Sequence, residues 1–319
     1  MNQVSGFLNV YKEAGYTSHD VVAIMRKILA SSGLAEGSKL KVGHTGTLDP
    51  AAEGVLPICI GKATKLADYA GAGLKRYCAV LKLGLTSDTQ DDTGTILSEA
   101  PVTATREDIV KAVRSFKGEV AQIPPMYSAV KIKGEKLYEI ARRGETVERA
   151  PRNILIKRID IAEFRDDNSL SIDVTCSRGT YIRTLCHDIG EKLGCGGVMG
   201  SLVRVASGVF SVETSLKLDQ LREAAEKGNL SALIRPIDTC LPFTSVVVNE
   251  QATPSMLTGN KVKIESLQSH EYPPKRERRV FVHGYDGQLG GLFEYVYDPA
   301  HTGERKLILK PLVMLGARN

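Results

Sequence analysis

The sequence predicts an α+β fold, in which strands and helices alternate along the chain without an internal repeat. Apolar and polar residues alternate strictly at 170–176 and clearly at 75–84, as expected of strands with one solvated face. Other segments have helical periodicity, begin at a capping threonine and end at a glycine. A chain of 319 residues can bury a substantial core, and we expect one large and one small domain.

The composition favours an anionic partner and excludes several classes of protein. Lys and Arg number 42 against 37 acidic residues, which gives a net charge of +5. The six cysteines include no C-x-x-C pair and no histidine at metal-ligand spacing, so we expect reduced, mostly buried thiols and no metal. No segment is typical of a signal peptide or a membrane span, and we expect a cytoplasmic protein that does not bind membranes.

The first expected elements are a strand at 5–12 and a helix that begins after Thr17 and ends at Gly33. Thr17 with Asp20 resembles a capping box. A strand at 74–85 and an acid-rich turn at 86–94 come next, and we assign Asp88 and Asp92 in this turn to solvent. Further helices are expected at 105–116, 135–143, 181–193 and 218–226.

The sequence pattern changes near Ser245, and beyond it short apolar segments are interrupted by glycine and charged residues. We therefore predict two domains, residues 1–244 and residues 245–319, the second a small β-rich module. It contains a basic stretch, Pro274 to Arg279.

The loop from Gly43 to Pro50, G-H-T-G-T-L-D-P, is the strongest candidate for a functional site. Its two glycines permit unusual backbone angles, and Pro50 restricts Asp49 to extended conformations, so the Asp49 carboxylate is presented rigidly. A single positioned acid suits nucleophilic or base chemistry. The alternative is that Asp49 caps a turn and His44 packs against backbone.

This loop, followed by G-V-L-P, resembles the catalytic motif of the TruB family, the tRNA pseudouridine-55 synthases. The resemblance covers about residues 5 to 240 in ordered motifs, with one departure: Glu13 stands where the family has proline. The other matching strings are K-x-Y at 75–77, the acid-rich turn, P-P-M-Y-S-A-V-K at 124–131, G-T-Y-I-R-T at 179–184, and L-V-R with S-G-x-F at 202–210.

The resemblance implies isomerisation of a uridine in the T arm of tRNA, at position 55, to pseudouridine, with base flipping and no cofactor. Asp49 would add to the sugar, add to uracil or remove the 2′ proton, and the sequence does not choose among these routes. Arg183 would pair with Asp49 and favour its ionised form. Tyr77 would pack on the uracil and is a candidate base for the C5 proton, and Asp91 would join the hydrogen-bond network of the site.

Further substrate contacts are expected from Tyr181, Leu202 and Lys12. His44 would fill the space left by the flipped base, or pack within its loop. Two sets of cations would either contact phosphates or remain solvated: Lys12, Lys62, Lys65 and Lys131, and the cluster Arg142, Arg143, Arg149 and Arg152.

The resemblance also implies the pseudouridine-synthase fold: a mixed, mostly antiparallel sheet with flanking helices and a central cleft, lined by the segment 122–134, plus a PUA-like C-terminal module that helps to hold RNA. The expected partner is the T stem-loop of tRNA, bound by a monomer. Two alternatives are a non-catalytic RNA-binding protein or tRNA chaperone, and a carboxylate glycosidase or nucleosidase that releases free uracil.

Overall fold

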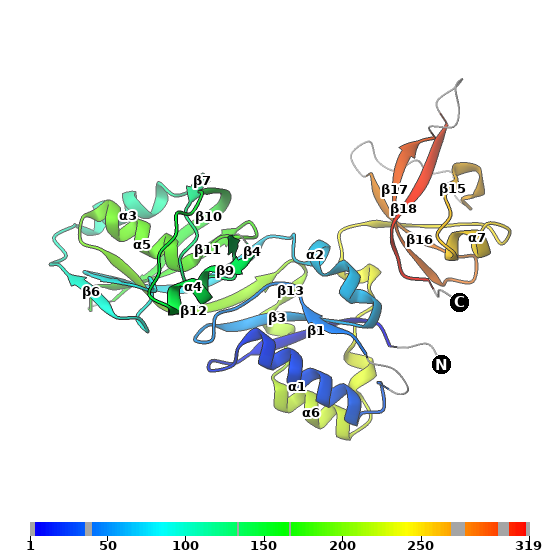
Figure 1. Ribbon diagram of the computed structural model, residues 1–319, viewed down its shortest axis with the longest axis horizontal. Coiled ribbons are helices and arrows are strands. Elements are labelled where there is room, and N and C mark those ends of the chain that lie inside the picture. The colour runs from blue at the N-terminus through cyan, green and yellow to red at the C-terminus, as the bar shows by residue number, and fades with distance from the viewer. Residues whose placement is uncertain are drawn as a thin grey trace.

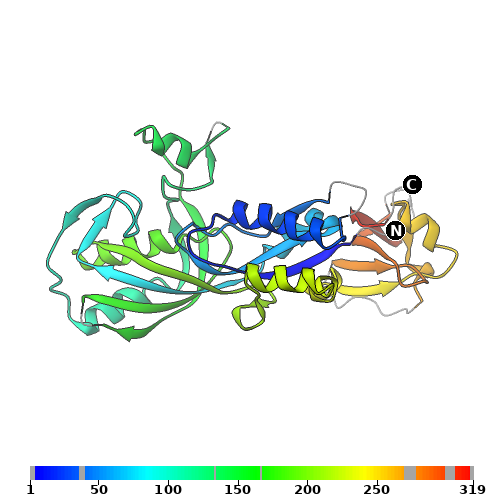
Figure 2. The same ribbon diagram turned by 90° about the horizontal axis from the view of Figure 1, so that it is seen from below.

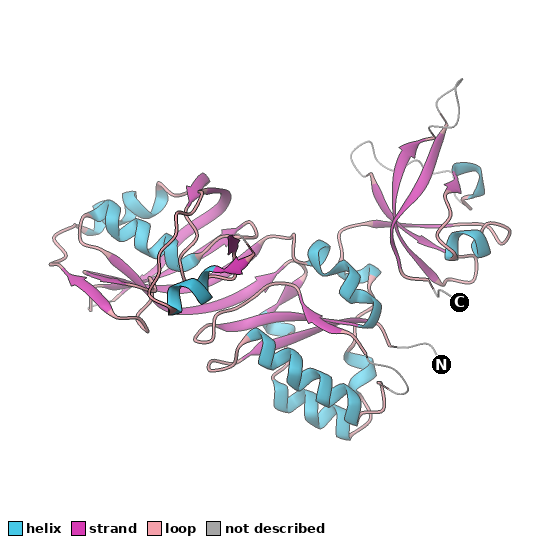
Figure 3. Cartoon of the chain, viewed as in Figure 1, coloured by secondary structure: helices cyan, strands magenta, loops and turns pink. Residues whose placement is uncertain are grey.

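The computed structural model describes residues 4–35, 40–132, 134–165, 167–268, 278–298 and 306–316. They form a long lobe built on one large sheet and a smaller C-terminal lobe built on a second sheet (Figure 1). Helices lie against the large sheet, as Figure 3 shows by element type. The predicted α+β class is confirmed.

The large sheet is mixed and mostly antiparallel. Its strands are β1 Gly6–Lys12, β2 Val42–His44, β3 Glu53–Ile60, β4 Lys75–Leu83, β7 Gly118–Gln122, β10 Arg152–Phe164, β11 Ser169–Cys176, β12 Gly197–Ser207 and β13 Phe210–Ser211. The order is β1-β3-β12-β4-β11-β10-β7, with β2 beside β3 and β13 beside β12. Only β3 and β12 pair in parallel among these strands, and they are the second and third strands of that order.

Two helices, α1 (Ser18–Ser31) and α6 (Leu218–Glu226), cover the half of the sheet that contains β1 and β3 (Figure 1). The α1 helix begins as predicted, because the Thr17 side chain accepts a hydrogen bond from the Asp20 amide and Asp20 accepts one from the Thr17 amide. The apolar faces of both helices pack on Val10, Leu56 and other strand residues. This core anchors the strands that flank the Gly43–Pro50 loop.

The other half of the sheet is covered by α3 (Arg106–Arg114) and α5 (Ile182–Leu193). Thr105 and Asp108 form a second capping box, and Gly194 ends α5 with a φ of 74°, a left-handed conformation that suits glycine. The predicted helices in this region are confirmed, with ends that differ by one or two residues.

Residues 123–151 leave the sheet after β7 and form a small unit that projects from it, coloured green in Figure 2. The unit contains β8 (Lys131–Ile132), β9 (Glu135–Lys136) and α4 (Leu137–Arg142). The helix expected from 135 starts later because Glu135 and Lys136 pair with β8. The segment 122–134 resembles a family strand, but residues 123–130 form no strand here, since two prolines lack an amide hydrogen. Tyr127, Ser128 and Ala129 nevertheless line cavities, as expected of a segment beside the cleft.

The C-terminal lobe is a curled five-stranded sheet in the order β14-β16-β17-β18-β15. Its elements are β14 Thr244–Val247, α7 Thr253–Leu257, β15 Val262–Lys263, β16 Arg279–His283, β17 Leu289–Tyr297 and β18 Leu307–Met314. Phe281 and Leu292 of this lobe share one apolar cluster with Phe7 and Phe210 of the large sheet. Most of the basic stretch predicted at 274–279 lies outside the described residues; Arg278 and Arg279 lie within them.

Short elements complete the described chain. They are α2 Ala67–Ala70, the hairpin β5 Leu85–Ser87 and β6 Ile96–Glu99, and the 3-10 helices Gly61–Leu66, Val212–Thr214, Leu230–Leu233, Asp238–Cys240 and Ile264–Ser266.

Candidate functional site

The loop that carries Asp49 joins β2 to β3 and is anchored by a buried serine. The Ser18 hydroxyl donates to the Leu48 carbonyl at 3.1 Å and accepts from the Leu48 amide at 2.8 Å. The Leu48 side chain is buried in the core between α5 and the sheet. The next residue, Asp49, keeps 42% of its side chain exposed, so a fixed loop presents an accessible carboxylate.

Lys12 lies under the same loop, and its position does not fit the predicted phosphate contact. The side chain is fully buried (0% exposed), and Nζ donates to the carbonyls of Ala52 (2.6 Å), Pro50 (3.1 Å) and Glu13 (3.2 Å). Burial lowers the pKa of Lys12 to about 8, while the nearby Asp49 charge opposes this shift. Lys12 therefore stabilises the backbone after Asp49 and is not available to RNA.

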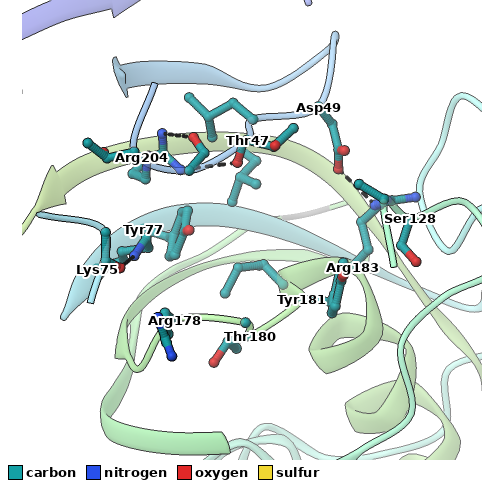
Figure 4. Close-up of a pocket in the computed structure, with 18 of the residues that line it drawn as sticks. Thr47, Asp49, Lys75, Tyr77, Ser128, Arg178, Thr180, Tyr181, Arg183 and Arg204 are labelled. Atoms are coloured by element: carbon teal, nitrogen blue, oxygen red, sulfur yellow. Dashed lines mark hydrogen bonds and ion pairs between the residues drawn. The ribbon is translucent and has the colours of Figure 1, made fainter. Parts of the chain in front are cut away.

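Arg183 meets Asp49 from the first turn of α5 (Figure 4). Its Nε lies 3.0 Å from Asp49 Oδ2, and its terminal nitrogens donate to the carbonyls of Thr89 (3.0 Å) and Tyr127 (2.8 Å). The guanidinium is almost fully buried, at 6% exposure. Three directed contacts hold this charge in place, and a rigid guanidinium in turn orients the carboxylate.

Asp91 completes this charged network. Its Oδ2 lies 3.7 Å from Arg183 Nη1, and its Oδ1 accepts hydrogen bonds from the side chains of Thr89 (2.7 Å) and Thr93 (2.6 Å). Asp92, assigned to solvent from the sequence, instead pairs with Lys82 at 2.8 Å. The structure thus brings Asp49, Arg183 and Asp91 together from three distant segments.

On one side of Asp49 is a cavity of about 340 Å³, which we call the Tyr77 cavity. Tyr77 lies on β4 and is 6% exposed. Burial raises the pKa of Tyr77, and the positive charge of Arg204, its cross-strand neighbour on β12, opposes this shift. Other residues that line the cavity are Thr45, Gly46, Thr47, Leu48, Asp49, Asp68, Gly71, Lys75, Ser128, Ala129, Arg178, Gly179, Thr180, Tyr181, Ile182, Arg183, Leu202 and Arg204.

Tyr181 and Leu202 therefore both line the Tyr77 cavity, as expected of substrate contacts. Tyr181 precedes α5, and its backbone is fixed by Gln122, which accepts from the Tyr181 amide at 2.8 Å and donates to its carbonyl at 3.0 Å. Leu202 lies on β12, directly opposite Ala79 of β4. These apolar and aromatic walls suit a flat heterocyclic base.

On the other side of Asp49 is a larger, open space of about 780 Å³, which we call the His44 hollow. Burial lowers the pKa of His44, so its ring is neutral at pH 7. Lys136 and Arg142 of the projecting unit line this hollow, with Lys136 Nζ and Arg142 Cζ each 5.3 Å from the centre of the Tyr138 ring. Lys136 Nζ also donates to the Tyr138 hydroxyl at 3.1 Å and lies 3.9 Å from Glu139, but its side chain stays 40% exposed. The hollow thus combines neutral histidine with accessible cations.

Several other predicted phosphate contacts are already engaged within the protein. Arg143 pairs with Glu135 and Glu145, Arg149 donates to the Pro124 carbonyl at 3.1 Å, and Lys65 donates to the Met314 carbonyl at 2.8 Å. Lys131 and Arg152 are exposed and Lys62 is half-buried, and no observation tests their contact with phosphate.

Sequence reasoning missed Lys75, Ser128 and Arg204, all of which line the Tyr77 cavity. Lys75 begins the K-x-Y string and Arg204 ends the L-V-R string, so both stood within motifs that were noticed for a neighbouring residue. Within the described residues, no cluster of His, Cys, Asp and Glu is arranged to hold a metal ion. No helix in that part of the chain is long and apolar enough to cross a membrane.

Comparison with solved structures defines the class of protein. A chain of a Cbf5-Nop10-Gar1 complex matches with a TM-score of 0.70 at 26% identity, over 97% of this chain and 85% of that chain. A chain of an H/ACA RNP bound to a substrate RNA containing 2′-deoxyuridine matches with a TM-score of 0.69 at 24% identity, over 97% and 85% of the two chains. The fold is that of the pseudouridine synthases, as predicted.

The family follows from the sequence matches. Residues 34–182 match the TruB family pseudouridylate synthase (N terminal domain), and residues 183–242 match the tRNA pseudouridylate synthase B C-terminal domain. A tRNA pseudouridine synthase B from Alkaliphilus oremlandii is 48% identical over 81% of this chain and 83% of that protein. Another, from Clostridium acetobutylicum, is 45% identical over 87% and 92%. The chain belongs to the TruB family.

Proposed function

We propose that this protein isomerises a uridine of tRNA to pseudouridine, at position 55 in the T loop, and acts as a monomer in the cytoplasm. Family membership and the relatives named tRNA pseudouridine synthase B support the reaction and the RNA class. The observation that carries the assignment of the site is the 3.0 Å ion pair between Asp49 and Arg183, at the edge of a cavity that contains Tyr77.

The reaction must break the N1–C1′ bond, turn the uracil while it stays bound, and join C5 to C1′. The Asp49 carboxylate would add to C1′, add to the uracil ring, or remove the 2′ proton; each role needs an accessible, oriented carboxylate. The three contacts of Arg183 provide that orientation. After C5 joins C1′, the C5 proton must be transferred to a base.

Tyr77 would hold the detached uracil by stacking, so that it turns in plane and does not diffuse away. Because burial raises the pKa of Tyr77, its hydroxyl stays protonated near neutral pH. This favours the stacking role, because Tyr77 could accept the C5 proton only as a phenolate, the form that burial disfavours.

The target base must leave its stack in the RNA, at a cost of a few kcal/mol. The His44 hollow adjoins the Asp49 wall of the Tyr77 cavity, since Asp49, Thr47 and Arg183 line both. A neutral His44 ring would occupy the space that the flipped base leaves. Lys136 and Arg142 would contact the phosphates around it.

Replacement of Asp49 by Asn tests the proposal, because it removes the charge and keeps the shape. We expect pseudouridine formation in a T stem-loop RNA to fall more than about 10²-fold, while the Kd for this RNA changes little. Asp219→Asn on α6, which removes an exposed carboxylate that pairs with Arg222, is the matched control and should stay fully active.

Activity that survives in Asp49→Asn would contradict the role of Asp49. Wild-type protein that binds the RNA without modifying it would favour an RNA chaperone. Release of free uracil by the wild type would favour a nucleosidase.

A further inference from the structure

Two buried cations border the Tyr77 cavity without a carboxylate to neutralise them. Lys75 is 7% exposed and Arg204 is 1% exposed. No described acid forms an ion pair within 4.0 Å of either, although Asp49 and Asp68 line the same cavity. Burying a charge is costly unless a counter-charge or hydrogen bonds compensate it. Two buried cations without a counter-charge at a cavity therefore point to a functional role for their charge.

Both cations are held by neutral backbone carbonyls. Arg204 donates to Val55 (2.7 Å), Gly46 (3.0 Å) and Thr47 (3.2 Å), and Lys75 donates to Gly71 (2.7 Å). These bonds fix the positions of the charges but leave them unneutralised. Burial, with the Arg204 charge second, lowers the pKa of Lys75 to about 8, so Lys75 remains mostly protonated near neutral pH.

The cations lie beside the aromatic ring that would receive the base. Lys75 is two residues before Tyr77 on β4, and Arg204 is the cross-strand partner of Tyr77 on β12 (Figure 4). The apolar groups around them, such as Leu202 and Ile182, suit a flat ring more than a phosphate group. An anion formed on such a ring would meet both charges in a site shielded from water.

We propose that Lys75 and Arg204 stabilise the uracil electrostatically as it departs with the N1–C1′ electron pair. This inference rests on the proposed function. The bond breaks towards the base, and the negative charge spreads over N1, O2 and O4 of uracil. The electron deficiency at C1′ is relieved by a bond to the Asp49 carboxylate or by loss of the 2′ proton. The charge disappears when C5 joins C1′, with release of the Asp49 carboxylate or return of the 2′ proton, and the C5 proton then moves through a base to N1. Lys75 and Arg204 form no covalent bond.

The test compares two leaving groups. Single-turnover consumption of the N-linked nucleoside is measured with T stem-loop RNAs that carry uridine or 5-fluorouridine at the target position, after nuclease digestion and chromatography. Fluorine stabilises the departing uracil anion, so the enzyme has less stabilisation to supply. We expect Lys75→Met to lower the single-turnover rate on the uridine RNA about 10- to 100-fold. The fold reduction on the 5-fluorouridine RNA should be at least five times smaller, and the Kd for both RNAs should be unchanged.

A second variant separates charge from hydrogen bonding. Lys75→Gln is neutral and keeps a hydrogen-bond donor, one atom closer to the backbone than the Lys75 Nζ that donates to the Gly71 carbonyl. It should be as slow as Lys75→Met if the charge matters, and near wild type if Lys75 only holds the backbone, which would overturn the proposal. If Lys75→Met does not fold, Lys75→Gln replaces it as the variant that removes the charge. Arg76→Met, on the opposite face of β4 where Arg76 pairs with Asp173, is the matched control and should keep wild-type rates.

An equal loss on both substrates, or a loss confined to RNA affinity, would also overturn the proposal. Failure of the proposed function looks different, because wild-type protein would then either consume neither nucleoside or release the free base instead of forming the C-linked product.

Discussion

The Tyr77 cavity and the His44 hollow share Asp49 and Arg183 but differ in how far their other cationic side chains are exposed to solvent. In the Tyr77 cavity, Lys75 and Arg204 are buried and bonded to backbone, and exposed Arg178 lies at its rim. In the His44 hollow, the Lys136 side chain is 40% exposed and Arg142 is exposed. Salt screens exposed charges far more than buried ones. On the proposed function, one space would serve the chemistry on the base and the other would serve the binding of the RNA backbone.

The largest expected effect comes from the wall between the two spaces. The planar Arg183 guanidinium makes three directed contacts, and in Arg183→Lys a single ammonium group takes its place. Asp49 therefore loses its orientation. We expect kcat for pseudouridine formation to fall about 10²-fold, with RNA affinity retained. Steady-state kinetics and filter binding measure the two quantities.

The matched control is Arg222→Lys on α6, where the guanidinium is exposed and pairs with Asp219. If Arg183→Lys weakened RNA binding and left kcat unchanged, Arg183 would act in RNA binding, and the assignment of the two spaces to chemistry and binding would be wrong.

A smaller effect is expected in the His44 hollow. Lys136→Ala combined with Arg142→Ala should weaken RNA binding, leave kcat near wild type, and reduce the slope of log Kd against log salt concentration by about 1 to 2. Binding titrations from low to moderate salt measure this slope.

The control pair is Arg222→Ala with Lys227→Ala, which removes two exposed, ion-paired cations from α6 and its C-terminus. An unchanged salt slope in the Lys136 and Arg142 variant would exclude these side chains from phosphate contact.

The smallest effect concerns the stability cost of a buried cation, for which Lys12 is the clearest case. The pKa of Lys12 is about 8 in the folded protein and 10.5 ordinarily, so between these values the unfolded chain binds the extra proton. Lys12 therefore makes the free energy of unfolding rise with pH above 8, by up to about 1.4 kcal/mol per pH unit. Buried thiols such as Cys59, whose pKa burial raises to about 12, have the opposite slope.

The measured quantity is therefore a difference between variants. Urea unfolding at pH 8.0, 8.75 and 9.5 should show a slope that is less positive in Lys12→Met than in the wild type. Lys131→Met, which removes an exposed lysine, should keep the wild-type slope. Equal slopes in all three proteins would contradict the assignment of Lys12 as a buried cation.

Local patterns predicted the elements better than the contacts between them. The capping boxes at Thr17 and Thr105 and the alternation in β4 and β11 depend on residues within a few positions, so the sequence reveals them directly. The irregular path of residues 123–130 depends on the projecting unit, which has its own small core around Leu137 and Ile140. No local periodicity encodes that core.

The site shows the same division. Asp49, Tyr77 and Arg183 were found because each stands in a motif that resembles a known family. Lys12 was misassigned because the carbonyls of Pro50 and Ala52, which satisfy its ammonium group, are about forty residues away in the sequence. Arg204 was missed for a similar reason: its partners Gly46 and Thr47 come from the other end of the catalytic region.

The apolar cluster that joins the two lobes has a consequence for dissecting the protein. Phe281, Leu292 and Leu315 bury their side chains among Phe7, Val55 and Phe210 of the large sheet. A chain cut after residue 244 would expose the apolar side chains of Phe7, Val55 and Phe210 on the large sheet. The separated C-terminal lobe would expose the apolar side chains that cover them in the intact chain. Thermal melting of the intact chain should accordingly show one transition, and studies of RNA affinity should alter the tail by point substitution and not by deletion.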